Sequence, residues 1–179
     1  LLAELPVRFH TTVHGYSLMP NHFHVMLTAG AHGLGAPLRY LQGEYSRWLN
    51  RRRRWDGPVW RARYKSRPVD SDDYWRHLLA YLHRNPVRGG LVPHVDAARW
   101  TSHEAYAGLA QAPEWLDMAE HLDLFGGVLT YREYLADLAV GKDVAPDGFD
   151  PDMLFARPAR VQPAAIERAS RQRIVAQWP

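Results

Sequence analysis

The chain has 179 residues, 46% of them hydrophobic, with a net charge of +3 and no cysteine. This composition fits one globular domain and excludes a disordered chain, and the missing cysteines exclude disulfides, thiolate metal sites and thiol nucleophiles. No run approaches the roughly 20 apolar residues of a membrane span and no signal peptide is evident, so we expect a soluble, cytoplasmic protein.

The charge is divided unequally along the chain. Residues 39–88 hold thirteen Arg or Lys against five Asp or Glu, whereas residues 101–156 hold two basic residues against eleven acidic ones. A basic half predicts a polyanionic partner. The excess of twenty Arg over two Lys carries no functional weight, because the base composition of the gene explains it equally well.

The N-terminal part predicts a hairpin and then a helix. Residues 1–5 resemble the end of a helix, so we expect the chain to begin inside its fold. Residues 7–18 and 22–28 are rich in strand formers and flank the turn residues 19–21, which predicts an antiparallel hairpin. Apolar residues then recur at helical spacing, which predicts a helix over residues 37–54.

The middle of the chain predicts a third strand and a second long helix. Residues 59–69 alternate as in a strand, and Pro68 indicates that the strand ends near there or lies at a sheet edge. Ser71, followed by two aspartates, is a typical helix start. We expect this helix to end at Asn85, because a residue that precedes proline is disfavoured in the helical region.

Beyond Trp100 the pattern predicts short helices at residues 102–109, 113–125 and 131–138, and a linker from residue 141 with a basic helix over 164–177. We therefore divide the chain into a main domain (1–100), an acidic helical extension (101–140) and a linker with tail (141–179). The acidic extension either covers the basic face or completes the core.

His22 and His24 are the first candidate site residues. Alternate residues of a strand point to the same side, so the two imidazoles would lie close enough to share one metal ion. An arbitrary His-x-His pair is, however, more often a pair of core or surface histidines.

Tyr81 and Asn85 are the second pair. Four residues apart, they share one helix face with Tyr74 and His77, rotated away from the apolar stripe of the same helix. This face would place a nucleophile and an amide beside the core. The alternative is that Tyr81 packs at the rim and Asn85 caps the helix.

Three stretches in order carry a resemblance to a known family. They are GYSLMPNHFHVML (15–27), GPVWRARYKS (57–66) and YLHRNPVRGGLV (81–92). Together they closely resemble the REP-associated tyrosine transposases, which belong to the insertion-sequence-200-like transposases. The resemblance extends over residues 1–138.

The resemblance implies an α+β fold with a ferredoxin-like antiparallel sheet and helices on one face. The family normally opens with another strand and a full helix, and we expect this first strand to be missing here. By resemblance, His22 and His24 are metal ligands, Tyr81 is the nucleophile and Asn85 is the third ligand. The expected ion is Mg²⁺ or Mn²⁺, which suits phosphoryl chemistry.

The implied activity is cleavage and rejoining of single-stranded DNA near hairpins. Tyr81 would attack a phosphodiester and form a 5′-phosphotyrosine, helped by the metal or by His77. One alternative is a module that binds hairpin DNA without cutting it. Another is a metal-dependent hydrolase of a small phosphoester that uses the histidines and no tyrosine.

A basic stripe is the candidate DNA surface, because phosphates pair with cations and unpaired bases stack on aromatic rings. A solvated helix end explains the four consecutive arginines nearly as well. The partner would be single-stranded or hairpin DNA, and the protein a monomer or homodimer. The predicted DNA-binding residues are Arg51, Arg52, Arg53, Arg54, Arg61, Arg63, Lys65, Arg67 and Trp60.

Overall fold

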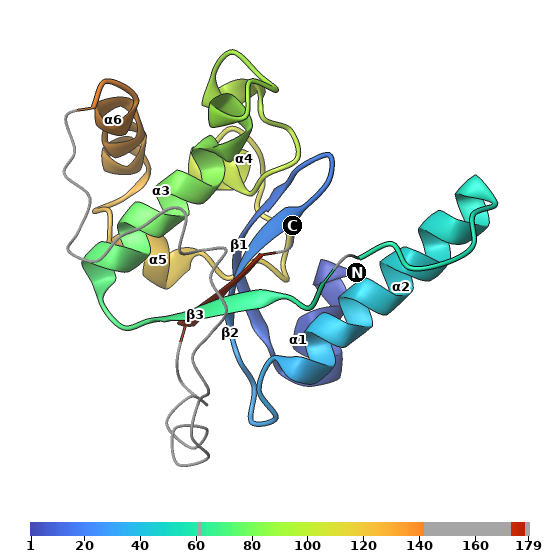
Figure 1. Cartoon of the computed structure of the whole chain (residues 1–179). Helices are drawn as coiled ribbons and strands as arrows, with labels where there is room; N and C mark the ends of the chain where they lie inside the picture. The colour runs from blue at the N-terminus through green and yellow to red at the C-terminus, as the bar shows by residue number, and fades with distance from the viewer. Residues whose placement is uncertain (61, 142–172, 178–179) are drawn as a thin grey trace.

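The computed structural model describes residues 1–60, 62–141 and 173–177. These residues form a mixed α+β fold, as predicted (Figure 1). None of the helices in the described part is long and apolar enough to cross a membrane. In chain order the elements are η1 (Leu2–Glu4), α1 (Leu5–Phe9), β1 (Thr12–Leu18), β2 (Phe23–Thr28), α2 (Gly35–Arg53), β3 (Lys65–Val69), α3 (Asp72–Arg88), η2 (Val95–Ala97), α4 (His103–Tyr106), α5 (Ala119–Asp123), α6 (Val128–Ala139) and β4 (Arg173–Gln177).

The sheet has four strands in the order β1-β2-β4-β3, and each neighbouring pair is antiparallel. The predicted hairpin is confirmed as β1 and β2. The predicted helix over 164–177 is wrong for residues 173–177, which form β4, and its remainder lies outside the described residues. The sequence Arg-Ile-Val-Ala-Gln contains two β-branched residues, and β2 and β3 supply hydrogen-bond partners on both sides.

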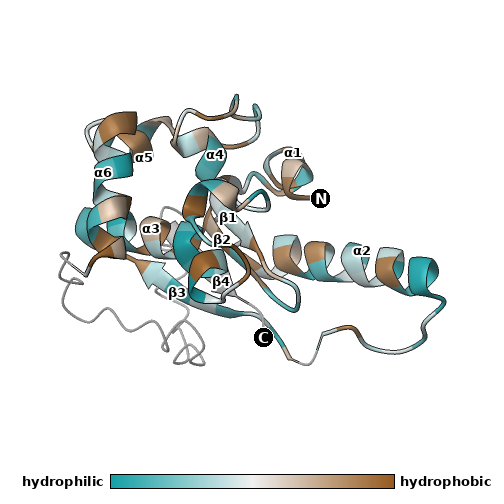
Figure 2. Ribbon diagram, turned by 90° about the horizontal axis from the view of Figure 1, so that it is seen from above, coloured by the Kyte–Doolittle hydropathy of each residue, from teal (hydrophilic) through white to brown (hydrophobic). Residues whose placement is uncertain are grey.

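Helices cover both faces of the sheet, so the prediction of helices on one face is wrong (Figures 1 and 2). Side chains alternate along β2. Val25 and Leu27 pack in one cluster with α1 and α2, whereas Met26 packs in the other with α3 to α6. We call these two sides the α2 face and the α3 face.

Helix α3 begins where its sequence predicts. Ser71 Oγ accepts a hydrogen bond from Tyr74 N at 3.3 Å and so caps the helix. The helix lies close against β1, since a Cβ on Gly15 would come 2.7 Å from Leu79 Cδ1. It does not end at Asn85 but continues through Pro86 to Arg88, and Gly89 N then donates to Asn85 O at 2.8 Å.

Two other boundaries differ from the prediction, and the structure decides between the two alternatives for the extension. Residues 5–9 are helical, so the first strand begins only at Thr12. The third strand is limited to residues 65–69, and the described residues of 55–64 have no regular structure. The extension 101–140 completes the core, because Tyr106, Phe125, Tyr131 and Leu135 are buried in one cluster with α3.

Candidate active site

The two histidines of the predicted pair lie side by side at the turn of the hairpin. His22 stands immediately before β2 and His24 is its second residue. Their ring centroids are 5.0 Å apart, and the ring planes are inclined at 86°. The hairpin therefore brings together the imidazoles that the spacing predicts to be neighbours.

Each imidazole has one nitrogen suited to bind a metal. His22 Nδ1 donates to Asn21 Oδ1 at 2.7 Å, which leaves Nε2 with its lone pair. His24 is 2% exposed, and its Nε2 is buried without a hydrogen-bond partner among the described residues. Burial, and secondarily the neighbouring His22, lowers the pKa of His24 to about 3. His24 is thus neutral at physiological pH, as a metal ligand must be.

Ser17 is a further candidate site residue that the sequence did not reveal. It pairs with His24 across the hairpin, so both side chains share a face. Its Oγ is also buried and has no hydrogen-bond partner in the described part of the chain. The hairpin register was the only signal, since a serine in a strand is unremarkable.

The α3 face carries His24 as well as Tyr81. His24 and Met26 are alternate residues of β2, and Met26 packs in the same cluster as Tyr81. The C-terminal end of α3 reaches the hairpin turn, because a Cβ on Gly89 would come 3.1 Å from Met19 Cε. The helix with the predicted nucleophile thus packs on the hairpin that carries the predicted ligand, with β1 as its main contact.

Tyr81 is buried rather than placed at a rim, with 9% of its surface exposed. The guanidinium of Arg88 lies over its ring, 4.6 Å from the centroid. Sequence reasoning missed Arg88, which lies two helical turns beyond Tyr81, because the helix was expected to end at Asn85. Asn85 is buried too, and its Nδ2 has no hydrogen-bond partner among the described residues.

His77, the predicted helper of Tyr81, contacts the extension. Its Nδ1 lies 3.3 Å from the hydroxyl of Tyr134 in α6. Among the described residues, no group of three or more His, Cys or carboxylate side chains is arranged to hold a metal. An ion at His22 and His24 would therefore depend on the amide of Asn85, the substrate and water, which are the oxygen ligands that Mg²⁺ accepts. The buried, neutral His24 with its unpartnered Nε2 fits such an ion.

The predicted basic stripe is divided between the two faces. Arg51, Arg52 and Arg53 occupy the last turn of α2 and Arg54 follows it, all of them exposed. Lys65 and Arg67 alternate with Val69 on the α3 face, and the Arg67 guanidinium lies 5.0 Å from the Tyr74 ring centroid. Arg63 is exposed in the connection before β3, and Arg61 lies outside the described residues. Helix α2 has 19 residues and extends roughly 28 Å, so its C-terminal end stands beyond the sheet (Figure 2).

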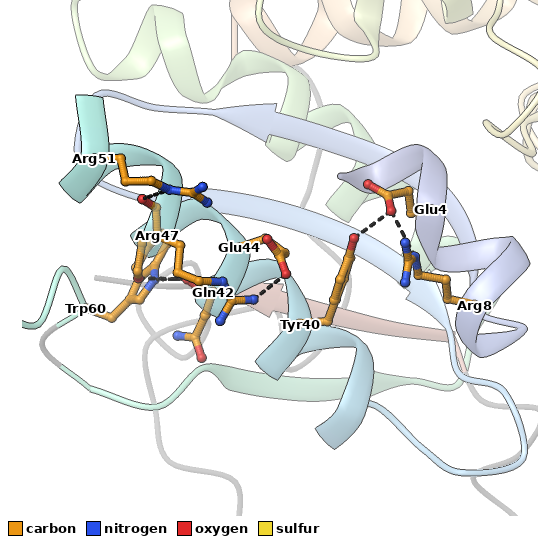
Figure 3. Close-up of polar contacts among 9 residues, drawn as sticks. Glu4, Arg8, Tyr40, Gln42, Glu44, Arg47, Arg51 and Trp60 are labelled. Carbon is orange, nitrogen blue, oxygen red and sulfur yellow. Dashed lines mark hydrogen bonds and ion pairs between the residues drawn. The ribbon is translucent and has the colours of Figure 1, made fainter. Parts of the chain in front are cut away.

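Trp60 is fixed on the α2 face. Its Nε1 donates to Gln42 O of α2 at 3.0 Å (Figure 3). Trp60 and His22 both line a cavity of about 1070 Å³. The cavity on the α2 face thus extends to one member of the histidine pair.

Comparison of the chain with family models, curated proteins and solved structures found no match.

Proposed function

We propose that the protein is a metal-dependent transposase or endonuclease of the single-tyrosine HUH kind, which cleaves and rejoins single-stranded DNA near hairpins. The observation that carries this proposal is the unpartnered, buried Nε2 of His24, adjacent to His22 and on the face where Tyr81 packs. The family resemblance of the three sequence stretches supports the same assignment.

The proposed roles are those that the family resemblance implies for these residues. A divalent Mg²⁺ or Mn²⁺ ion held by His22, His24 and Asn85 would withdraw charge from a non-bridging phosphate oxygen. The Tyr81 oxygen attacks phosphorus, the bond from phosphorus to the 3′ oxygen breaks, and the phenolic proton passes through solvent to the departing 3′ oxygen. The products are a 5′-phosphotyrosine and a free 3′-hydroxyl. Another 3′-hydroxyl can reverse the step and join two strands without ATP.

Arg88 would assist Tyr81. Its guanidinium over the ring stabilises the negative charge that the phenolic oxygen gains as it loses its proton. This contribution comes from the chain itself and needs neither His77 nor the ion.

We also propose that the sheet is ferredoxin-like, with β4 in the position that the family's first strand would take. The support is the strand order β1-β2-β4-β3 with every pair antiparallel. A ferredoxin-like sheet has the same arrangement, in which the first strand lies between the third and the fourth. In this protein, β4 would flank the histidine strand on the side away from β1.

The test is covalent trapping. The purified chain is incubated with Mn²⁺ and a hairpin oligonucleotide that carries single-stranded flanks and a label 3′ to the cleaved bond. We expect a labelled protein band that survives denaturation, requires Mn²⁺, and is absent in Tyr81→Phe. Tyr74→Phe on the same helix is the matched control and should retain the band. Persistence of the adduct in Tyr81→Phe would contradict the proposal.

The burial of Tyr81 favours a second candidate, a hairpin-binding module that does not cut. A nucleophile with 9% of its surface exposed must be uncovered before phosphorus can reach it. Tight hairpin binding with no adduct in Mg²⁺, Mn²⁺, Co²⁺ or Ni²⁺ would establish this candidate and reject the transposase.

A further inference from the structure

The cavity on the α2 face has the size of a ligand site and an unusual lining. Its volume of about 1070 Å³ matches the upper range of small-molecule pockets. Six aromatic side chains line it together with His22, and Arg99 is the only charged side chain among its described lining residues. The six are Tyr16, Phe23, Tyr45, Trp60, Trp100 and Trp115.

The rings come from separate elements and form two groups. Trp60 lies between Phe23 and Tyr45, with ring centroids 5.6 Å and 5.5 Å away. Tyr16 and Trp115 form the second group at 5.8 Å with an angle of 34° between their planes. The hydrogen bond from Trp60 Nε1 to Gln42 O fixes the indole against α2 (Figure 3). These aromatic rings are therefore fixed in the cavity wall, where a planar ligand can stack on them.

Two of the aromatic side chains that line the cavity are exposed to solvent. Trp100 is 72% exposed and Tyr45 is 38% exposed. The exposed Arg99 adjoins Trp100, and the arginines of the last turn of α2 lie beyond Tyr45 on the same helix. A flat, apolar interior with cations outside suits a ligand that has an aromatic ring and an anionic tether.

We propose that this cavity binds unpaired nucleobases of a DNA single strand, with Tyr45 and Trp100 as stacking residues and Arg99 facing the backbone. The inference rests on the proposed function for its ligand class. His22 provides the connection, since it lines the cavity and belongs to the proposed metal site. A strand whose bases enter the cavity passes the hairpin turn, which would set the position of the cleaved bond relative to the bound bases.

The test measures equilibrium binding without cleavage. A fluorescein-labelled 12-nucleotide single strand is titrated with protein in EDTA, and Kd is obtained from anisotropy. Stacking contributes about 1–3 kcal/mol per base, so Tyr45→Ala and Trp100→Ala should each raise Kd roughly 5- to 160-fold. Trp55→Ala is the matched control, because Trp55 is 59% exposed at the basic end of α2 and does not line the cavity. It should change Kd less than twofold.

A second arm tests the bases themselves. An oligonucleotide with abasic residues should bind the wild type more weakly than the normal strand binds Trp100→Ala, because it loses stacking on both Tyr45 and Trp100, and Trp100→Ala should weaken binding of the abasic strand little further. Circular dichroism and urea midpoints matching the wild type would show that both cavity variants fold. Equal Kd for normal and abasic strands, or an equal effect of Trp55→Ala, would overturn the proposal.

The two proposals fail separately. If Tyr45→Ala and Trp100→Ala leave Kd unchanged while the Tyr81 adduct persists, the cavity is rejected as a base site and the transposase proposal remains. Stacking without any adduct would keep the cavity as a binding site and reject cleavage.

Discussion

The two faces of the sheet differ in the polarity of their interiors. On the α3 face, a chain of hydrogen bonds crosses the core: Tyr131 bridges His103 and His83, and His83 Nε2 meets Ser102 Oγ at 2.6 Å. On the α2 face, the interior is apolar and aromatic and opens into the cavity beside His22.

The contrast shows where function is expected. A fold satisfies nearly all of its buried polar groups, so exceptions need an explanation. His24, Ser17 and Asn85 are such exceptions within the described chain. We interpret the α3 face as the place of chemistry and the α2 face as the place of strand binding.

The largest expected effect lies in β4, the inner strand between β2 and β3. Val175→Pro removes a backbone N–H from the middle of this strand, and we expect the free energy of unfolding in urea to fall by on the order of 3 kcal/mol. Val175→Ile, which keeps the N–H, is the control. Equal stability of the two variants would show that β4 does not hold the sheet together.

Two buried histidines of the α3 face should respond in opposite directions. In His24→Leu an unpartnered Nε2 disappears, so stability should rise by about 1 kcal/mol while adduct formation falls at least about a hundredfold. In His14→Leu, contacts with Asp117 O at 3.0 Å and Thr28 Oγ1 at 2.8 Å disappear, so stability should fall by about 2 kcal/mol. Urea unfolding and covalent trapping measure both variants. A destabilised His24→Leu with normal trapping would contradict the assignment.

Two arginines that lie over aromatic rings provide a finer comparison of the faces. Arg88→Gln should slow single-turnover cleavage about tenfold at saturating DNA and leave Kd unchanged, because Arg88 covers Tyr81. Arg52→Gln, beside Trp48 on α2, should weaken binding in a salt-dependent way and leave the rate unchanged. If Arg88→Gln changed only Kd and Arg52→Gln changed only the cleavage rate, the proposed roles of the two faces would be contradicted.

The smallest effect concerns pH. Burial lowers the pKa of His83 and His103 in the folded protein, so below pH 7 the unfolded chain binds more protons than the folded one. Stability should therefore fall as the pH is lowered, by about 1 kcal/mol between pH 7.5 and 6. His83→Gln should reduce this slope, and His94→Gln, at an exposed position, should preserve it. Urea midpoints across this range give the slope, and stability that increases toward pH 6 would contradict the interpretation.

Local sequence patterns predicted the elements whose conformation depends on residues close in sequence. The hairpin, α2 and the capped start of α3 follow from alternation, helical spacing and Ser71. β4 could not be predicted, because its strand conformation depends on pairing with β2 and β3, which are distant in sequence. The helical boundary at Asn85 failed because packing against β1 and the last-turn hydrogen bonds sustain α3 past Pro86.

The parts of the candidate site that lie on a single hairpin or helix could be predicted from the sequence. The proximity of His22 and His24 followed from spacing, and Tyr81 and Asn85 followed from one helix. The position of Ser17 opposite His24 depends on the hairpin register, and that of Arg88 over Tyr81 depends on the true end of α3. The aromatic cavity could not be foreseen, because its rings come from β1, β2, α2 and three loops.

The most direct measurement is the identity of the residue that becomes linked to DNA. The Mn²⁺-dependent adduct is digested with nuclease and protease, and mass spectrometry locates the remaining phosphonucleotide. The account predicts that it is attached to Tyr81, in the peptide between Arg76 and Arg84. Attachment to another of the nine tyrosines, or a noncovalent complex alone, would contradict it.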